Sequence, residues 1–518
     1  MLIAQMDSEA TDENRPETSS LTSSLQMPSI SSLQGATPQS DRSNRRAFLS
    51  AVFAGSAVSV ISAATLLLRA PTNALTTLLG SIHDRQARAI FDGHLDMRRP
   101  DLAIEAFDID GKYHTYFGIW PTLLRMPVLA VTHRFDGNLT GVSIMLALIV
   151  ALCATASLQY QLMTIDRRPA LAHCKIASAR WWMLAGMQTL VGTGTVVAFL
   201  ASRPMVYHEM EMWGIAGALA VAALTLRYLA RSSVQRAIAL SGAVTVTLLS
   251  RPSVGLGAVA SLVVVISVAI LRRHGVARIG TLIVGMVCAL GIYGGVNVAR
   301  FGGPFSLPLE RQVFSASDPQ RQAVLAANDG SLFAAKYAPT TLFQYLRPDA
   351  LRFDDQFPWV NFPAHRARVI GRDVIFDTLD RSSSLTASMT GLCLLGGFGA
   401  LYVGKRRGRL HPATNSMALA VAVGGAVGSV AVFTIAYVAQ RYLSDLLAPL
   451  VVFAIIGAQR MVERSLKWAA RAVAALCIVG IWINLGLAIV YQRDPKCGDP
   501  DYGRGTTQTV CLVNSKSN

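Results

Sequence analysis

Residues 237–273 read AIALSGAVTVTLLSRPSVGLGAVASLVVVISVAILRR, and the way this stretch folds decides the topology of the chain after it. Two apolar runs, 237–250 and 254–271, are separated by the sequence SRPSVG. As one span, the stretch would place Arg272 and Arg273 on the outer side of a membrane and invert every later segment, against the positive-inside rule. We therefore predict two short helices that turn at Arg251–Pro252, with Arg251 at the outer membrane surface.

The rest of the chain is equally apolar. Of 518 residues, 52% are hydrophobic and 15% are charged, the mean hydropathy is +0.41 and the formal net charge is +16. A bilayer is crossed by about 20 apolar residues in a helix. The sequence therefore predicts an all-α integral membrane protein with about eleven transmembrane helices, over 47–68, 139–162, 182–202, 212–230, 237–250, 254–271, 279–298, 388–403, 414–438, 443–459 and 470–491.

Lysine and arginine residues gather in every second connection, at 167–180, 227–236, 272–278, 405–409 and 460–471. This alternation indicates cytoplasmic loops rather than a nucleic-acid surface, because no basic and aromatic platform accompanies it. We expect a multi-pass protein of the plasma (inner) membrane with a cytoplasmic N-terminus and an extracytoplasmic C-terminus. Residues 1–44, rich in Ser, Thr, Gln and Pro, are predicted to be disordered, and residues 45–491 form the polytopic domain.

Three segments are then expected outside the cytoplasm: 70–138, 299–387 and the tail 492–518. The tail carries Cys497 and Cys511, which are candidates for a disulfide in an oxidising compartment. The other cysteines lie in apolar spans or a cytoplasmic loop, and no Cys or Cys/His spacing indicates a metal site.

The first outer segment is acidic and then aromatic. It carries Asp84, a helical apolar pattern around 82–91 that predicts an amphipathic helix on the membrane face, and the stretch EAFDIDGKYHTYFGIWPTLLRMP at 105–127. Asp110–Gly111 predicts a turn, the aromatic residues predict an interfacial belt, and Pro121 predicts the start of the next helix. On these residues alone, the bland alternative is a solvated acidic loop anchored by aromatic side chains.

Six segments in this order carry a resemblance. The run FGIWPTLLRMPVLAV leads into TGVSIMLALIVALCATASLQYQL, and RPMVYHEMEMWG, SRPSVGL, NVARFGGPF and QRYLSDLLAPL follow. Together they resemble bacterial GT-C glycosyltransferases, the polytopic enzymes related to protein mannosyltransferases and lipid A aminoarabinose transferases. Each motif alone is weak, and their order over about two thirds of the chain carries the likeness.

The resemblance implies that an acidic residue of the first outer loop is the catalytic base and that basic residues hold the phosphate of the donor. Asp84 is the first candidate for the base, although the family commonly has two adjacent acids and Asp84 is followed by Arg85. The alternatives are Glu105 and Asp108.

Three further candidates lie at outer membrane edges. Glu209 lies where an unpaired carboxylate is costly, so we expect it either to form an ion pair or to take part in catalysis. His208 beside it is either its partner or an interfacial residue. Arg251 and Arg441 are candidate ligands of the donor phosphate. Their bland alternative is snorkelling at the interface.

The expected function is transfer of a hexosyl or pentosyl group from a polyprenyl-phosphate carrier to an envelope glycan, lipid or protein. No nucleotide-binding motif is found, which favours a lipid-linked donor. No cofactor is indicated, although the clustered acids permit a divalent metal. The alternatives are a transporter or flippase of a lipid-linked sugar, and a non-catalytic envelope scaffold.

Overall fold

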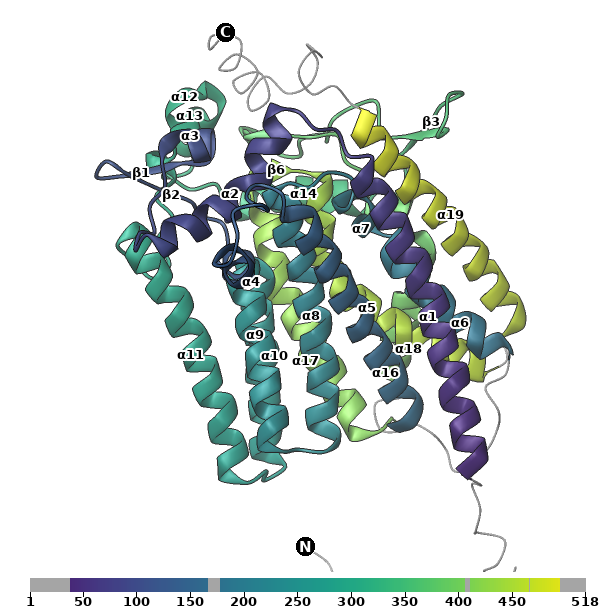
Figure 1. Ribbon diagram of the computed structural model, residues 1–518. Coiled ribbons are helices and arrows are strands. Elements are labelled where there is room, and N and C mark those ends of the chain that lie inside the picture. The colour runs from purple at the N-terminus through teal and green to yellow at the C-terminus, as the bar shows by residue number, and fades with distance from the viewer. Residues whose placement is uncertain (1–37, 166–177, 406–409, 465, 494–518) are drawn as a thin grey trace, which may run out of the picture.

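The structure is a computed structural model that describes residues 38–165, 178–405, 410–464 and 466–493. Over these residues the chain forms a bundle of long helices with a mixed helical and β segment at one end (Figure 1). We call residues 70–138 and 302–387 the cap. The candidate disulfide between Cys497 and Cys511 lies outside the described residues, as do residues 1–37, and the first helix already begins at Pro38 within the stretch expected to be disordered.

Within the described residues, eight helices are long and apolar enough to cross a membrane. The chain is therefore a multi-pass, all-α membrane protein, as the sequence predicts. The eight are α1 (Pro38–Leu68), α5 (Thr140–Ile165), α8 (Val206–Ala230), α10 (Pro252–Leu271), α11 (Val276–Phe301), α17 (Pro412–Thr434), α18 (Leu447–Glu463, preceded by the 3-10 helix η7, Gln440–Leu446) and α19 (Lys467–Arg493).

Three of the eleven expected spans form shorter helices: α6 (Ser178–Thr193), α9 (Val234–Ser250) and α16 (Thr390–Lys405). The expected span 182–202 is interrupted after α6, and α7 (Val196–Leu200) begins anew with Thr195 as its N-cap, whose hydroxyl accepts a hydrogen bond from Val197 N at 3.2 Å. The apolar helical segments are thus present, while the number that cross the membrane stays a prediction.

The predicted break at Arg251–Pro252 is confirmed. Helix α9 ends at Ser250, α10 begins at Pro252, and Arg251 between them is extended, with φ −137° and ψ 100°. Proline suits the first helical position because it lacks the N–H that would have no partner there.

Small residues bring the membrane helices together. A Cβ atom added to Gly257 of α10 would lie 2.3 Å from the backbone oxygen of Gly424 in α17, and one added to Gly399 of α16 would lie 1.9 Å from that of Phe453 in α18. Membrane helices associate mainly through close van der Waals packing, because the surrounding lipid tails are as apolar as leucine side chains and add no hydrophobic driving force.

The first cap segment contains α2 (Ala74–Phe91), α3 (Arg99–Leu102), η2 (Ala103–Glu105), β1 (Phe107–Ile109), β2 (Lys112–His114) and α4 (Trp120–Leu129). Asp110 and Gly111 both have positive φ, 54° and 81°, as a two-residue hairpin between β1 and β2 requires. The turn and the helix start near Pro121 are confirmed.

Two details of this segment differ from expectation. Helix α2 is not simply amphipathic, because its polar residues His83, Asp84 and Gln86 are buried and the helix packs against α4, α5 and α8; its position on the membrane face stays a prediction. The run that begins at Pro121 does not enter the second membrane helix directly but forms α4, which ends at Leu129 before α5 begins.

The second cap segment is built from short elements, and it is tied to the first by a hydrogen bond from Val313 N to Ala106 O at 2.8 Å and by the bridge between Phe107 and Gln312. Figure 1 shows β1, β2, α3, α12 and α13 gathered at the same end of the bundle. Its elements, with β6 that pairs with β5, are η4 (Leu309–Arg311), α12 (Val313–Ser317), α13 (Pro319–Ala326), η5 (Ala335–Tyr337), α14 (Ala338–Leu346), β3 (Arg352–Phe353), β4 (Val360–Asn361), β5 (Thr378–Leu379), α15 (Leu385–Ser388) and β6 (Tyr437–Val438).

Candidate active site

The first turns of α8 organise the polar residues beneath the cap. Tyr207, Glu209 and Glu211 follow one another at intervals of two residues. Because a helix turns about 100° per residue, Tyr207 and Glu211 lie near the same side of α8 and Glu209 lies on the opposite side. Each of the three contacts a different polar cluster.

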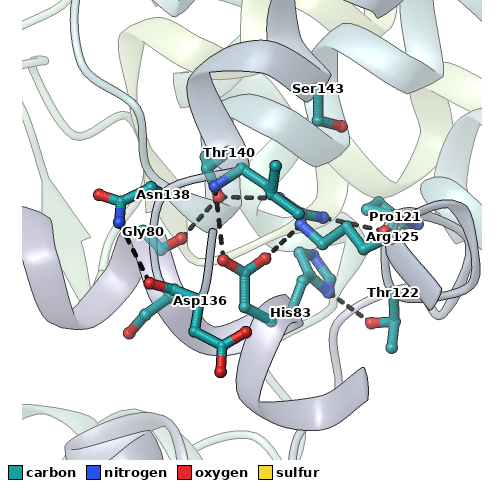
Figure 2. A network of polar contacts seen from close by, with 12 residues as sticks. Gly80, His83, Pro121, Thr122, Arg125, Asp136, Asn138, Thr140 and Ser143 are labelled. Carbon is teal, nitrogen blue, oxygen red and sulfur yellow. Dashed lines mark hydrogen bonds and ion pairs between the residues drawn. The ribbon is translucent and has the colours of Figure 1, made fainter. Parts of the chain in front are cut away.

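The first cluster joins Asp84 and Glu209 through Arg125 of α4. Figure 2 shows Arg125 between Pro121 and Thr140, two of its hydrogen-bond partners. Arg125 Nε lies 2.5 Å from Asp84 Oδ1, Nη1 lies 2.7 Å from Glu209 Oε1, and Nη2 donates to Glu209 Oε2 at 2.8 Å. The remaining guanidinium hydrogens go to Thr140 Oγ1 at 2.8 Å and Pro121 O at 2.9 Å. The side chains of Asp84, Arg125 and Glu209 are 1%, 2% and 0% exposed, so this cluster is closed to solvent.

This closure changes the ranking of the candidate bases. Asp84 is held in an ion pair inside the fold, although burial raises the pKa of its carboxyl against the opposing charge of Arg125. Glu209 is expected either to form an ion pair or to take part in catalysis, and the structure shows it in an ion pair with Arg125. His208 Nδ1 lies 2.9 Å from Arg203 O and 3.1 Å from Leu200 O.

The second cluster surrounds Glu105, which is 5% exposed at the end of η2. Its Oε1 accepts a hydrogen bond from the Tyr207 hydroxyl, and its Oε2 accepts from Gln312 Nε2 at 3.3 Å. Gln312 Oε1 accepts in turn from Arg321 Nη1 at 3.0 Å, and Arg321 Nε pairs with Asp377 Oδ1 at 2.8 Å. Glu105 is thus bound by neutral donors, while the nearby arginine is committed to another carboxylate.

The electrostatics of Glu105 follow from this arrangement. Burial raises the pKa of its carboxyl, and the Tyr207 hydrogen bond and the charges of Arg321 and Arg441 oppose that rise. A carboxylate whose pKa is raised holds a proton more readily, which suits a general base that works near neutral pH.

Arg441, in η7, lies on the other side of Tyr207. Its guanidinium carbon is 4.8 Å from the centre of the Tyr207 ring, 5.1 Å from that of Tyr442 and 5.3 Å from that of Tyr437. Arg441 is half-buried and lines a hollow together with Asp380, a carboxylate whose charge acts on it. The three aromatic rings fix the position of the Arg441 charge.

The third cluster holds Arg251, the other arginine expected to bind phosphate. Arg251 Nη2 lies 2.9 Å from Glu211 Oε1, and Nε lies 2.9 Å from Asp445 Oδ1. Ser253 Oγ donates to Asp445 Oδ2 at 2.8 Å, and Ser444 donates to Glu211. With two buried carboxylates as partners, Arg251 is less available to a phosphate than Arg441.

Asp108 lies apart from these clusters. It belongs to β1, and its Oδ1 accepts a hydrogen bond from Gly111 N at 3.0 Å within the hairpin. It lines a cap hollow of about 630 Å³ together with Asp110, Glu310 and Arg311. The structure thus brings Glu105 and Arg441 to one cluster, Asp84 and Glu209 to a second, and leaves Arg251 and Asp108 in separate surroundings.

Sequence reasoning overlooked the partners Arg125, Tyr207, Arg321 and Asp445. A signal for Arg125 was present, because a carboxylate at the edge of an apolar helix requires a cation, and Arg125 stands in an otherwise apolar run. No comparable signal marks Tyr207, whose role depends on the angle between α8 and the cap. Among the described residues, no group of three or more His, Cys, Asp or Glu side chains is placed to hold a metal ion.

Comparisons with known proteins give only distant likenesses. No protein-family model matches the chain, and no curated protein matches it. Among solved structures, the archaeal oligosaccharyltransferase AglB from Archaeoglobus fulgidus, in complex with an inhibitory peptide and a dolichol-phosphate, aligns at 11% identity and a TM-score of 0.46, over 89% of this chain and 60% of that one.

A second structure of an Archaeoglobus fulgidus oligosaccharyltransferase, tethered to an acceptor peptide, aligns at 12% identity and a TM-score of 0.42, over 87% of this chain and 56% of that one. The chain thus spans about 60% of the length of the first of these proteins. Likeness of this degree does not establish a shared activity, so the functional argument depends on the site itself.

Proposed function

We propose that this protein is a GT-C-type membrane glycosyltransferase that moves a sugar from a polyprenyl-phosphate carrier to an acceptor hydroxyl of the cell envelope. One observation carries the proposal: a buried carboxylate, Glu105, accepts a hydrogen bond from the Tyr207 hydroxyl, and an arginine, Arg441, lies over the ring of the same tyrosine. A base and a phosphate ligand are the two groups that such a transfer needs. In this proposal the cap lies outside the cytoplasm and the bundle spans the plasma membrane.

The chemistry assigns one role to each group. Glu105 takes the proton of the acceptor hydroxyl while that oxygen attacks the anomeric carbon, and the bond from this carbon to the carrier phosphate breaks. The electron pair of that bond leaves on the phosphate oxygen, whose growing negative charge Arg441 stabilises. The acceptor gains the sugar, the carrier leaves as polyprenyl phosphate, and no other reactant is required.

Tyr207 acts as a positioning residue in this scheme. Its hydroxyl orients the Glu105 carboxylate, and its ring supports the Arg441 guanidinium. The Asp84–Arg125–Glu209 cluster fixes α2, α4 and α8 relative to one another, which holds Tyr207 in place.

The decisive experiment measures sugar transfer from a panel of synthetic polyprenyl-phosphate sugars to an envelope extract by purified protein in detergent. We expect Glu105→Gln to lower turnover about 10²- to 10⁴-fold, the usual contribution of a general base. The matched control is Glu463→Gln. Glu463 is the last residue of α18 and pairs with Arg460, far along the chain from Arg441, so this variant should retain wild-type turnover.

Two outcomes contradict the proposal. Full turnover by folded Glu105→Gln removes the base that the geometry identifies. If no donor is consumed while the protein moves a lipid-linked sugar across a liposome membrane, and Glu105→Gln still does so, the protein is a transporter or flippase instead.

A further inference from the structure

Arg300 is a buried arginine that the proposed reaction does not use. It lies one residue before the end of α11 and is 3% exposed. Its Nη1 donates to Phe117 O at 2.9 Å, whereas its Nε and Nη2 have no hydrogen-bond partner. Within the described part of the chain it forms no ion pair with a carboxylate.

Three other arginines at this end of the bundle are paired with carboxylates. Arg125 pairs with Asp84 and Glu209, Arg251 pairs with Glu211 and Asp445, and Arg321 pairs with Asp377. A buried charge is stable only where it is paired and fully hydrogen-bonded. Arg300 has no such carboxylate partner among the described residues and therefore differs from these three arginines.

Further unpartnered polar atoms lie around Arg300. The His83 ring centre lies 6.4 Å from that of Phe117, whose carbonyl accepts from Arg300, and the His114 ring centre lies 6.4 Å from that of Phe301, the residue after Arg300. Three further buried atoms, His83 Nε2, His114 Nδ1 and Gln86 Nε2, have no hydrogen-bond partner. Thr122 links two of these residues: its hydroxyl donates to Gln86 Oε1 and contacts His83 Nδ1. Arginine and amide N–H groups only donate, and neutral histidines add no competing charge, so the group matches an acceptor that carries negative charge.

The position of α11 indicates where such an acceptor would come from. Figure 1 shows α11 at one edge of the bundle, next to α9. Its side chains Val284, Val287 and Ile292 are 61%, 59% and 48% exposed, so that face is open to lipid. The end of a spanning helix lies at the level of the lipid head groups, where the available anions are phosphates.

This place is distinct from the Glu105 cluster. Phe107, Tyr116 and Phe117 form a wall between them: Phe107 contacts Phe301 with ring centres 5.4 Å apart, Tyr116 contacts Phe117 at 4.4 Å, and Phe117 contacts Tyr207 at 5.3 Å. An anion beside Arg300 would therefore lie behind the aromatic stretch of the first cap segment, while Arg441 lies on the other side.

We propose that Arg300, together with His83, His114 and Gln86, forms a second oxyanion site, which binds the phosphate group of a membrane lipid at the cap end of α11. The shared chemistry is a phosphate monoester or diester, from a polyprenyl phosphate or a phospholipid head group, and binding there would hold Phe117 and the aromatic wall in place. This site does not depend on the proposed sugar transfer.

The test is ligand-dependent thermal unfolding of the full chain in dodecyl maltoside, without phosphate buffer. The ligands are farnesyl phosphate, a short-chain phosphatidylglycerol and inorganic phosphate, with farnesol as the uncharged control. We expect at least one phospholipid or prenyl phosphate to raise the unfolding midpoint of the wild type, and Arg300→Met to weaken half-saturation about tenfold or more, the scale of one lost hydrogen bond to a charged group. Arg300→Lys should restore part of the effect.

The control variant is Arg352→Met, which removes one exposed positive charge of the cap and should leave the shift unchanged. Without ligand, Arg300→Met should be at least as stable as the wild type, because it removes an unpaired buried charge, whereas Arg321→Met should be less stable because it leaves Asp377 unpaired. A response to inorganic phosphate alone, a response that persists in Arg300→Met, or no response to any of the three ligands overturns the proposal.

Discussion

Replacing Arg125 with methionine would leave two carboxylates buried with no cation between them. Asp84 and Glu209 are 1% and 0% exposed, and Arg125 makes one contact with the first and two with the second, at 2.5–2.8 Å. Removing one partner of a buried ion pair costs about 3–5 kcal/mol, and two acids lose a partner here, so we expect a loss near 5 kcal/mol. The ratio of folded to unfolded protein should fall about a thousandfold or more, because 1.4 kcal/mol is a factor of ten.

The assay is unfolding in mild detergent titrated with dodecyl sulfate and followed by intrinsic tryptophan fluorescence. Asp84→Asn is the comparison variant: Arg125 keeps its bidentate contact with Glu209, the repulsion between the two carboxylates disappears, and the expected loss is about 1–2 kcal/mol. The triple variant Arg125→Met, Asp84→Asn, Glu209→Gln removes all three charges together. It should recover most of the stability lost in Arg125→Met, because neutral groups can replace a buried ionic cluster at little cost.

The reasoning is wrong if Arg125→Met is as stable as the wild type, or if the triple variant is no more stable than Arg125→Met. Either result would mean that the cluster is hydrated in solution, and Asp84 would then return as a candidate base.

Three further predictions concern the proposed site and the packing of the bundle. The acid limb of the activity-against-pH profile should lie above the usual glutamate range, because burial raises the pKa of Glu105. Tyr207→Phe should move that limb to still higher pH, because it removes a hydrogen bond that lowers this pKa, and an unmoved limb would exclude Glu105 as the titrating base. Arg441→Met should lower kcat/KM for the polyprenyl-phosphate donor about 10²-fold, with partial recovery in Arg441→Lys; equal losses in both would point to packing against the tyrosines rather than charge. Gly257→Leu should destabilise the bundle by about 3 kcal/mol or more, because its Cβ would clash with the backbone of α17, whereas Gly280→Leu, with no atom within 4 Å, should unfold like the wild type.

Local features of the fold were accessible from the sequence. The Arg251–Pro252 break and the Asp110–Gly111 turn each depend on the backbone preferences of one or two residues, and both are found where expected. The membrane helices follow from apolar runs, and the remaining disagreement concerns the short segments, such as 182–202, where Gly194 and Thr195 end one helix and start another.

The site could be predicted only in its residue types. Glu105, Asp84, Glu209, Arg251 and Arg441 all contribute to buried polar clusters, yet their sequence positions do not show which acid meets which arginine. That pairing depends on contacts between residues far apart in the chain. The sequence does not distinguish one acid or one arginine at the membrane edge from another, because only their neighbours in the folded structure differ.

The two acids of α8 have a consequence for the order in which the protein is made. Arg125, the partner of Glu209, precedes α8 in the chain, whereas Arg251, the partner of Glu211, is synthesised after it. Helix α8 is also the least apolar of the eight long helices among the described residues. Its entry into the bilayer should therefore be incomplete in a nascent chain that stops at Ala230 and should improve once α9 and α10 have delivered Arg251, so that α8 waits beside the insertion machinery for a segment that is still being translated.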